Sequence, residues 1–397
     1  MTWVDAAIDS VQNHGDPYRF TYDNSTDIYT WAYRRIAYQT KHISDLFKTI
    51  FGDENVGPWK HIRPVLAGQA DTPIFAKDFL DYLSAVYGPP TNFIHAVAIA
   101  PYFNLGPYKM WSNLTVDQVL DGMNISLQKY LPEQGWSQQA PVGVHAIYAA
   151  WFNLPVHGYE GGPDTVDGCG SCSLESKINA TRHTRMTDIC VTFLDGWYRF
   201  GFQTFNWYSA GAMEKTPQYG DWGLLEDMRQ ETLIDTTKMF NATSPVAQLP
   251  RPSPKLKAID IVHERSIQLT FGIPIPSYNF NATNYMNHCI PYPYPDLRNL
   301  TVNSTFYYPI QIFESPIRIN ITVYVGGQSG LLEGGINNEQ FIVVKTPATI
   351  HTTTFTAAPS MEFRINQTIV PSIVAFRLKN VDNSYSISSF DVVLGTT

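Results

Sequence analysis

The sequence is poor in charge and has no excess of positive charge. Charged side chains make up 16% of the 397 residues, with 27 lysines and arginines against 35 aspartates and glutamates. A face that binds nucleic-acid phosphates is rich in lysine and arginine, so we expect no nucleic-acid partner. Aromatic residues make up 14% of the chain, which excludes a disordered protein, because disordered chains are charge-rich and aromatic-poor.

Long hydrophobic runs are also missing. No segment reaches 18 uninterrupted apolar residues, and the nearest, 140–156, contains Pro141, His145, Asn153 and Pro155. We therefore expect no membrane span. The first 20 residues have neither the basic start nor the apolar stretch of a signal peptide.

Cysteine is scarce, with four residues at Cys169, Cys172, Cys190 and Cys289. The first two form a C-x-x-C pair, but no second pair exists to complete a zinc site, and we expect neither a metal nor a cofactor. Structural disulfides are the expected role in a secreted chain, with free thiols as the alternative. Four cysteines allow three pairings, of which we favour Cys169–Cys172 together with Cys190–Cys289.

Sequons for N-glycosylation are frequent instead. Ten Asn-x-Ser/Thr motifs occur where chance would give about five, and none has proline in the middle. They favour a secreted, extracellular glycoprotein, with glycans chiefly on the C-terminal half, against the alternative of a merely Asn- and Thr-rich chain. Since no signal peptide begins the sequence, we expect the natural chain to start upstream of Met1. The sequons are Asn24, Asn113, Asn124, Asn179, Asn241, Asn281, Asn299, Asn303, Asn320 and Asn366.

Residues 1–243 alternate between helical and strand-like patterns. Apolar stripes at helical period predict helices over 27–51, 74–87, 116–131, 142–152, 184–200 and 224–240. The first stripe comprises Tyr29, Ala32, Tyr33, Ile36, Ile43, Phe47 and Ile50. Short apolar runs between the helices predict strands over 62–66, 93–101, 155–159 and 203–207. Such alternation predicts an α/β domain with a parallel sheet.

The pattern changes after residues 244–258, which carry four prolines and read as a linker. From 259 to 397, apolar and polar residues alternate at the period of strands, as in Ile317, Ile319, Ile321, Val323 and Val325. No helix is needed there. The second domain is predicted to be an all-β antiparallel sandwich.

Residues that follow the predicted strands could carry chemistry, because the carboxyl ends of parallel strands meet on one rim. Glu160 ends the strand 155–159 and precedes two glycines, although a solvated loop glutamate would look the same. Polar and aromatic groups on one rim resemble a sugar-binding site, where rings stack on pyranose faces, although single aromatics more often belong to the core. The candidates for binding substrate are Gln69, Tyr102, Asn206, Trp207 and Trp222, with Phe103 and Tyr208 beside them.

Residues of about 15–260 resemble the C-terminal part of a glycoside-hydrolase-like (β/α)8 barrel found in bacterial proteins often labelled cellulose-binding. The segment Tyr-Glu-Gly-Gly at 159–162 is the most specific match. The other matching segments are 33–52, 62–69, 98–103, 154–158, 205–207 and 220–225. Their order fits barrel strands five to eight with their helices.

The resemblance implies a role for Glu160, because the glutamate that ends strand seven is the nucleophile in retaining glycosidases of this architecture. The same family carries its acid/base glutamate in an Asn-Glu pair at the end of strand four. This sequence contains no such motif, and residues 1–25 resemble the segment just after it. The chain therefore resembles the second half of a TIM barrel followed by a β-sandwich. A half barrel exposes strand edges that must be covered, and we expect an upstream segment, with another subunit or a rearranged sheet as alternatives.

Two functions follow from these observations. The first is a secreted, N-glycosylated, glycoside-hydrolase-like protein that acts on or binds polysaccharide and lacks the acid/base half of its site. The second is a non-catalytic extracellular structural glycoprotein, such as a filament or coat subunit, built on a hydrolase-like scaffold. The expected partners are polysaccharide or N-glycans. The Glu160 rim favours the first, whereas the sequons and the missing acid/base residue favour the second.

Overall fold

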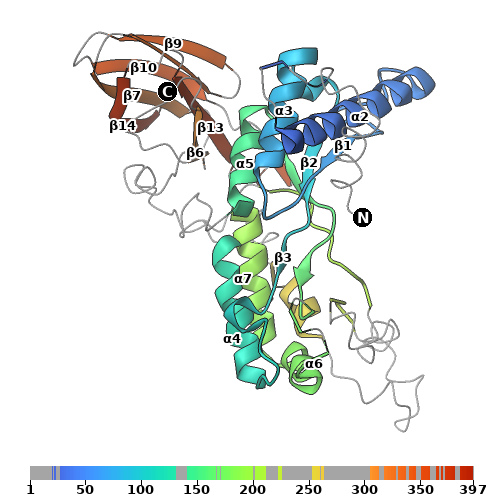
Figure 1. Cartoon of the computed structure of the whole chain (residues 1–397). Helices are drawn as coiled ribbons and strands as arrows, with labels where there is room; N and C mark the ends of the chain where they lie inside the picture. Colours follow the sequence, from blue (N-terminus) through green and yellow to red (C-terminus); the bar gives the residue numbers. More distant parts are fainter. Residues whose placement is uncertain are drawn as a thin grey trace.

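The structure is a computed structural model of the whole chain (Figure 1). It describes residues 20, 22–23, 27–130, 141–166, 168–169, 171–199, 202–211, 222–225, 253–259 and 261–262. It also describes the backbone of the C-terminal strands, at 305–312, 317–327, 330–336, 339–345, 350–357, 364–365, 368–369, 372–380 and 385–396. Predictions that fall elsewhere lie outside these residues.

The N-terminal part is a mixed α/β fold with a parallel sheet, as the sequence predicts. Strands β1 (Val65–Ala67), β2 (Ala96–Ile99) and β4 (Val156–Gly158) pair in parallel in the order β1-β2-β4. Segment 202–206 extends the order by one further position, through a parallel bridge between Gly158 and Phe205. The four predicted strands are therefore neighbours in sequence order, although the last forms only this one bridge.

Helices connect these strands. The described helices are α2 (Ile28–Phe51), α3 (Ile74–Tyr87), α4 (Val116–Ser126), α5 (Pro141–Trp151), α6 (Leu174–Arg182) and α7 (Arg185–Arg199). Five of them were predicted, and α6 was not. Asp27 caps α2 by accepting a hydrogen bond from the Thr30 N–H at 2.7 Å. Thr115 and Gln118 form the capping box that opens α4. The predicted continuation of α4 tightens into a 3₁₀ turn at Leu127–Tyr130.

The core lies between the sheet and the helices. Leu66, Val97, Ile99 and Val156 project from the strands into one cluster with the buried faces of the helices. Helix α5 is buried along its whole length, because it lies between other layers: it packs against α3 and also runs beside the C-terminal strand β13 (Ser372–Asn380). The long apolar run of the sequence is thus a buried helix. None of the helices in the described part of the chain is long and apolar enough to cross a membrane.

Helix α2 differs from its predicted packing. Ala32 and Tyr33 are buried, but Ile43, Phe47 and Ile50 on the same stripe are 49%, 37% and 67% exposed. Periodicity identified the apolar face correctly, but it does not say whether a neighbour covers that face. Figure 1 shows one end of α2 projecting beyond the elements around it.

Two segments after 222 depart from expectation. Leu224 and Leu225 do not begin a helix, because Leu225 bridges Gly211 in parallel and both residues donate backbone hydrogen bonds to the 209–210 segment. Residues 254–259, across the end of the predicted linker, are helical. Ala258 and Val262 join the core, and the buried Lys255 ammonium donates to the Gly223 carbonyl at 2.9 Å. The linker predicted from the proline content is therefore wrong for residues 254–258, which are helical.

The C-terminal part contains two antiparallel sheets. One has the order β10-β7-β14, built from β7 (Ile317–Gly327), β10 (Ile350–Ala357) and β14 (Tyr385–Thr396). The other has the order β6-β13-β8-β9, built from β6 (Thr305–Ile312), β13, β8 (Gly330–Ile336) and β9 (Glu339–Lys345). A short hairpin joins β11 (Arg364–Ile365) to β12 (Thr368–Ile369). Every residue described beyond Val262 is in a strand, in agreement with the predicted change of period.

Buried ionisable groups make the stability depend on pH. Burial lowers the pKa of His95 and of His145 to about 4, and it raises the pKa of Asp78 to about 6. Each imidazole is neutral in the fold and takes up a proton on unfolding between pH 6.5 and about 4. The free energy of unfolding therefore falls as the pH is lowered through this window, because the unfolded state binds more protons. The Asp78 contribution has the opposite sign, because the folded state binds the proton more tightly.

We expect acidification from pH 7 to pH 4 to lower the free energy of unfolding by about 3 kcal/mol, since two imidazoles outweigh one carboxyl. Asp78→Asn removes the opposing group. The variant should be more stable than the parent by about 2 kcal/mol at pH 7, and it should lose more stability on acidification. Urea unfolding curves at several pH values measure both quantities. A parent protein whose stability rises on acidification would contradict the assignment.

Candidate functional site

Glu160 and Tyr102 meet at the carboxyl ends of two neighbouring strands. Beyond β2 and β4 the chain forms a second, short parallel pair, β3 (Tyr102–Phe103) with β5 (Gly162–Pro163). This pair holds the two post-strand segments side by side, so that the Glu160 carboxylate lies near the Tyr102 hydroxyl and acts on its pKa. Such short strands give no periodic signal, so sequence reasoning placed each residue on the rim but missed the pair that joins them.

The two glycines after Glu160 allow this turn to pack closely. A Cβ at Gly161 would lie 2.9 Å from the Phe205 ring and 3.0 Å from the Pro101 carbonyl oxygen. Gly162 has a φ of +128°, and a Cβ there would lie 3.1 Å from the Trp207 ring. The glycines therefore bring the backbone under two aromatic rings. They leave Glu160 half-buried rather than fully open.

The Tyr102 hydroxyl is held in its protonated form. Burial raises its pKa well above the ordinary value, and the neighbouring Glu160 charge raises that pKa further. Tyr102 therefore faces Glu160 as a neutral hydroxyl, the form that can donate a hydrogen bond to a carboxylate. The Tyr102 main chain is fixed as well, because the buried Tyr130 hydroxyl donates to its carbonyl oxygen.

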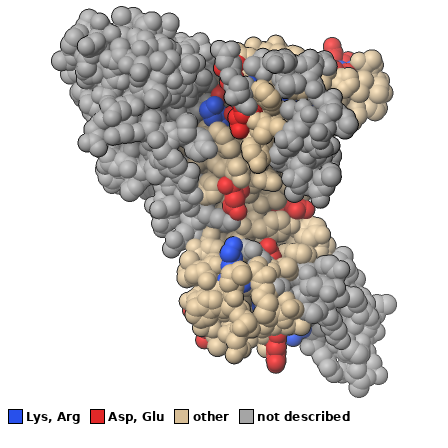
Figure 2. Space-filling view, in the orientation of Figure 1, with Lys and Arg blue, Asp and Glu red and all other residues tan. Residues whose placement is uncertain are grey.

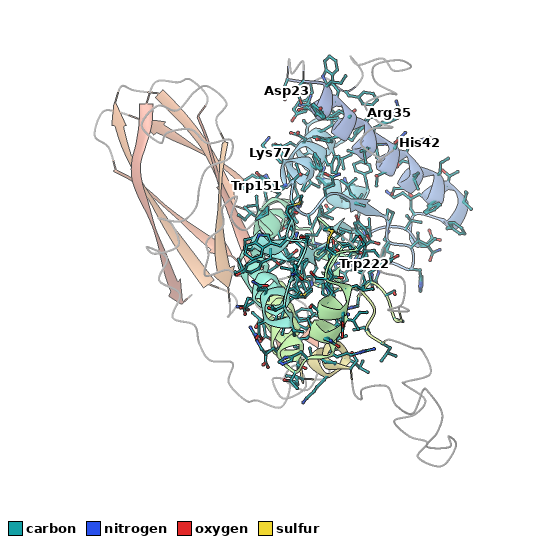
Figure 3. The ribbon with its side chains drawn as sticks, turned by 60° about the horizontal axis from the view of Figure 1, so that its bottom comes forward. Asp23, Arg35, His42, Lys77, Trp151 and Trp222 are labelled. Carbon is teal, nitrogen blue, oxygen red and sulfur yellow. A yellow bond between two sulfur atoms is a disulfide. The ribbon has the colours of Figure 1, made fainter. Side chains whose placement is uncertain are left out.

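Aromatic rings extend the site away from Glu160. Tyr208 lies edge-on to Tyr102 with ring centroids 6.5 Å apart, and Trp222 lies edge-on to Tyr208 at 5.6 Å. Tyr208 is 41% exposed, and the Tyr102 and Trp222 side chains are partly exposed. In Figure 3, Trp222 lies by the densely packed side chains in the middle of the molecule, whereas Arg35 and His42 lie along α2 and Asp23 lies near its first residues. We call Tyr102, Glu160, Tyr208 and Trp222 the aromatic rim.

The remaining predicted rim residues have different positions. Trp207 is a packing residue, since its ring covers Gly162 and its indole N–H donates to the Trp222 carbonyl at 2.9 Å. Asn206 is exposed beside the rim, and its backbone N–H bonds to Gly158. Gln69 is exposed after β1, two strands away from Glu160 in the sheet order, and no described contact joins the two.

A second carboxylate lies near the rim at Asp164. Its charge contributes to the raised pKa of Tyr102. Its backbone N–H donates to the Phe103 carbonyl at 2.7 Å, and its Oδ1 accepts from the Val166 N–H at 2.8 Å. Asp164 thus stabilises the loop after β5. Glu214 and Asp221, two further acids of the sequence that could supply a second carboxyl group, lie outside the described residues.

The structure offers no metal centre within its described residues. No group of three histidine, cysteine, aspartate or glutamate side chains there is placed to hold an ion. The rim is therefore an arrangement of one carboxylate with its hydroxyl donor and aromatic rings. Chemically, it can accept hydrogen bonds from hydroxyl groups and pack against apolar faces.

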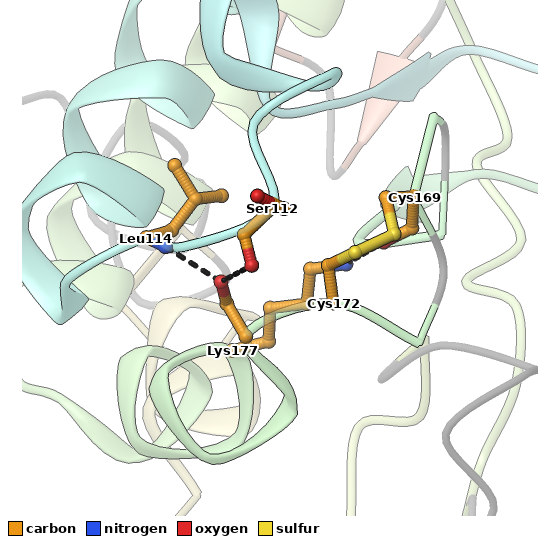
Figure 4. The surroundings of a disulfide bond; sticks show 6 residues. Ser112, Leu114, Cys169, Cys172 and Lys177 are labelled. Carbon is orange, nitrogen blue, oxygen red and sulfur yellow. Dashed lines mark hydrogen bonds between the residues drawn. A yellow bond between two sulfur atoms is a disulfide. The ribbon is translucent and has the colours of Figure 1, made fainter.

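The loop after the rim is closed by the predicted disulfide Cys169–Cys172, with Cα atoms 5.3 Å apart. Figure 4 shows its surroundings. The Ser173 hydroxyl accepts from the Leu114 N–H at 2.6 Å and donates to the Ser112 carbonyl at 3.1 Å. The Lys177 ammonium donates to the Cys169 carbonyl at 2.7 Å. These bonds fasten the loop to the segment before α4.

The second predicted disulfide, Cys190–Cys289, is not formed by Cys190, which is a buried free thiol on α7. Burial raises its pKa to about 12, so it is an unreactive core residue. Its place on the apolar face of an amphipathic helix explains the error, because a small hydrophobic residue fits there without a partner. Cys289 lies outside the described residues.

Three of the ten sequons fall on described side chains, at Asn113, Asn124 and Asn179, and all three asparagines are exposed. Asn320 is on β7, where the backbone alone is described. The other six sequons lie outside the described residues. Exposure at all three testable positions is what glycan attachment requires.

Figure 2 shows the charge on one face of the molecule. The described surface there is mostly uncharged, with scattered acidic side chains and few basic ones. Among the described residues this face has no basic stripe.

Comparisons with known proteins do not identify the chain. No protein-family model matches the sequence, and no curated protein matches it. A solved structure of CapF with the inhibitor 3-isopropenyl-tropolone aligns over 81% of this chain and 85% of its own, at 8% identity and a TM-score of 0.12. The capsular polysaccharide assembling protein CapF from Staphylococcus aureus aligns at 11% identity and a TM-score of 0.11, over 81% of this chain and 77% of its own. Scores this low show no common fold.

Proposed function

We propose that this chain is a secreted, glycoside-hydrolase-like protein that binds polysaccharide at the aromatic rim and does not hydrolyse it on its own. The observation that carries the proposal is the Tyr102–Glu160 pair, flanked by Tyr208 and Trp222. A carboxylate accepts hydrogen bonds from sugar hydroxyls, and aromatic rings pack against the C–H faces of pyranose rings. Both elements are needed for a ligand that is polar at its edges and apolar on its faces.

The parallel sheet supports a hydrolase-like scaffold. Strands in sequence order, each followed by helices, are the arrangement of one half of a (β/α)8 barrel, and the rim lies at their carboxyl ends, where such barrels bind ligands. For the C-terminal part, two antiparallel sheets of three and four strands support a β-sandwich.

Hydrolysis needs a second carboxyl group at a defined separation, of about 5–5.5 Å for retention and about 6.5–9.5 Å for inversion. The Asp164 carboxylate, like Glu160, raises the pKa of Tyr102 through its charge. However, its Oδ1 accepts a hydrogen bond from the Val166 N–H in the loop after β5. A binding role is therefore favoured over catalysis.

The test of this function is binding to a panel of soluble β-glucan oligosaccharides by isothermal titration calorimetry. We expect Glu160→Gln to weaken binding by about 10- to 100-fold, because a charged hydrogen-bond acceptor contributes about 1.5–3 kcal/mol. Trp222→Ala should also weaken it, by about 10-fold, through loss of ring contact. The matched control is Trp111→Ala, since Trp111 is 49% exposed and lies edge-on to Tyr108, outside the rim.

Binding that Glu160→Gln leaves unchanged would contradict the proposed site. Hydrolysis that disappears in Glu160→Gln would show instead that a second acid completes a catalytic pair. Asp164→Asn distinguishes these cases, because it would remove the hydrolysis and leave the binding.

A non-catalytic structural glycoprotein is the second candidate, and the exposed sequons favour it. We expect secreted protein from a eukaryotic host to exceed the 44.8 kDa polypeptide mass, with glycans on Asn113, Asn124 and Asn179. Treatment with a peptide N-glycosidase should convert each occupied asparagine to aspartate, which peptide mass spectrometry detects. A bare polypeptide mass would contradict glycosylation. If glycans are present and no sugar binds, the structural role would replace the binding role.

A further inference from the structure

The four-position parallel sheet has two open edges. Strand β1 is at one end of the order and segment 202–206 is at the other, and no described residue pairs with the outer side of either. Pro64 and Gly68 flank β1. The Pro64 carbonyl accepts a hydrogen bond from the His95 N–H, and the Gly68 N–H donates to the Ala98 carbonyl, so both groups face β2. The alternation of a parallel ladder then directs the N–H and C=O groups of Val65 and Ala67 away from the sheet.

The opposite edge has the same character. The Gly158 N–H donates to the Thr204 carbonyl, and the Asn206 N–H donates to the Gly158 carbonyl. These two bonds use the groups on either side of Phe205, whose own N–H and C=O therefore face outward. Each edge thus offers donors and acceptors to a further parallel strand.

Apolar side chains are exposed at the β1 edge. Val65 is 39% exposed, and Ala67, on the same face, is also exposed. The adjacent helix α2 leaves Ile43, Phe47 and Ile50 uncovered. An open strand edge beside uncovered apolar residues is what a strand-pairing partner stabilises.

The chain itself supplies the matching edge. A two-fold axis parallel to the strands keeps their direction, so it places β1 of one copy beside segment 202–206 of the other in parallel orientation. The same rotation forms the second contact between the two remaining edges. Such an interface is closed and self-complementary, and it leaves neither edge unpaired.

We propose that two copies of this chain pair through these edges, β1 of each against segment 202–206 of the other, to close one eight-stranded parallel barrel. The barrel has four strand positions from each copy, the number at which side chains fill a barrel interior. Segment 202–206 of the second copy covers the edge at Val65 and Ala67. The inference does not depend on the aromatic rim binding sugar.

Sedimentation velocity on enzymatically deglycosylated protein tests the pairing. We expect a particle of twice the 44.8 kDa chain mass. Val65→Lys places a charge inside the closed barrel, and it should raise the dissociation constant of the dimer at least 100-fold. Ile125→Lys is the matched control, because Ile125 is 40% exposed on α4 and belongs to neither edge. It should leave the dimer intact.

Ala67→Pro gives an independent variant. It deletes an N–H that faces the open edge and leaves the β1–β2 hydrogen bonds in place. Circular dichroism and the thermal midpoint of each variant verify that it folds. Hydrogen exchange adds a readout that needs no variant, since the amides of Val65 and Ala67 should be protected in the dimer and should exchange faster on dilution.

Three results would overturn the proposal. A monomer whose Val65 and Ala67 amides exchange at once would mean that the edge is open. A monomer that protects them would mean that the edge is covered from within one chain. A dimer that survives both Val65→Lys and Ala67→Pro would place the contact between copies elsewhere.

Discussion

Replacing Trp197 with alanine should lower the free energy of unfolding by about 4 kcal/mol, the range found when large aromatic residues are removed from a core. The Trp197 side chain is fully buried on α7, with ring centroids 4.3 Å from Phe202 and 5.5 Å from Phe205. Its indole N–H donates to the Gln203 carbonyl at 3.1 Å. The substitution therefore leaves a cavity and also removes this hydrogen bond.

The same substitution should affect the aromatic rim. Segment 202–206 has one strand bridge of its own, and Trp197 fastens it to α7. Tyr208 follows directly and should lose its fixed position. We expect Trp197→Ala to weaken binding of β-glucan oligosaccharides as well as stability, although Trp197 contacts no ligand.

Two comparisons make this measurement specific. Trp197→Phe keeps most of the ring but loses the N–H. It should therefore lower the free energy of unfolding by about 1–2 kcal/mol beyond the loss that the smaller side-chain volume causes. Trp111→Ala removes the same residue type from a position that is 49% exposed, and it should cost less than about 1 kcal/mol. Equal losses in Trp197→Ala and Trp111→Ala, by urea unfolding, would show that Trp197 does not hold the segment.

Local signals in the sequence predicted the helices and the order of the strands. Helices α2 and α4 begin within one residue of the predicted bounds, and Asp27 and Thr115 cap them, because a helix start depends on a few adjacent residues. The parallel strands β1, β2 and β4 lie close to the predicted runs, and the match is clearest for β2, which is buried on both faces and continuously apolar.

Features that depend on distant contacts were not predictable in the same way. The pairing of Cys190 with Cys289 required knowledge of what packs on α7, and the buried thiol is satisfied by that packing alone. Trp207 was correctly placed at the end of a strand, but its rotamer is set by Gly162 and Trp222, which are far away in sequence. The sequence likewise placed Tyr102 and Glu160 on one rim, whereas their proximity depends on the β3–β5 pair.

Gly122→Ala should lower the free energy of unfolding by about 2–3 kcal/mol, the cost of overpacking a rigid site. In the middle of an ordinary helix the same change raises the free energy of unfolding by up to about 1 kcal/mol, because alanine has the higher helix propensity. Gly122 lies in α4, where a Cβ would be 2.3 Å from the Leu105 carbonyl oxygen and 3.0 Å from the Tyr108 ring. That carbonyl belongs to a segment fixed by Gly106, whose φ is +53° and which lies against the Gly122 carbonyl in turn. Since two backbones meet there, neither can move aside cheaply, and α4 must shift away from the segment that joins β3 to α4. Urea unfolding measures the loss, and Ala180→Gly in α6 supplies the reference for helix propensity at a buried position. A more stable Gly122→Ala variant would mean that the close approach of α4 to Leu105 is absent.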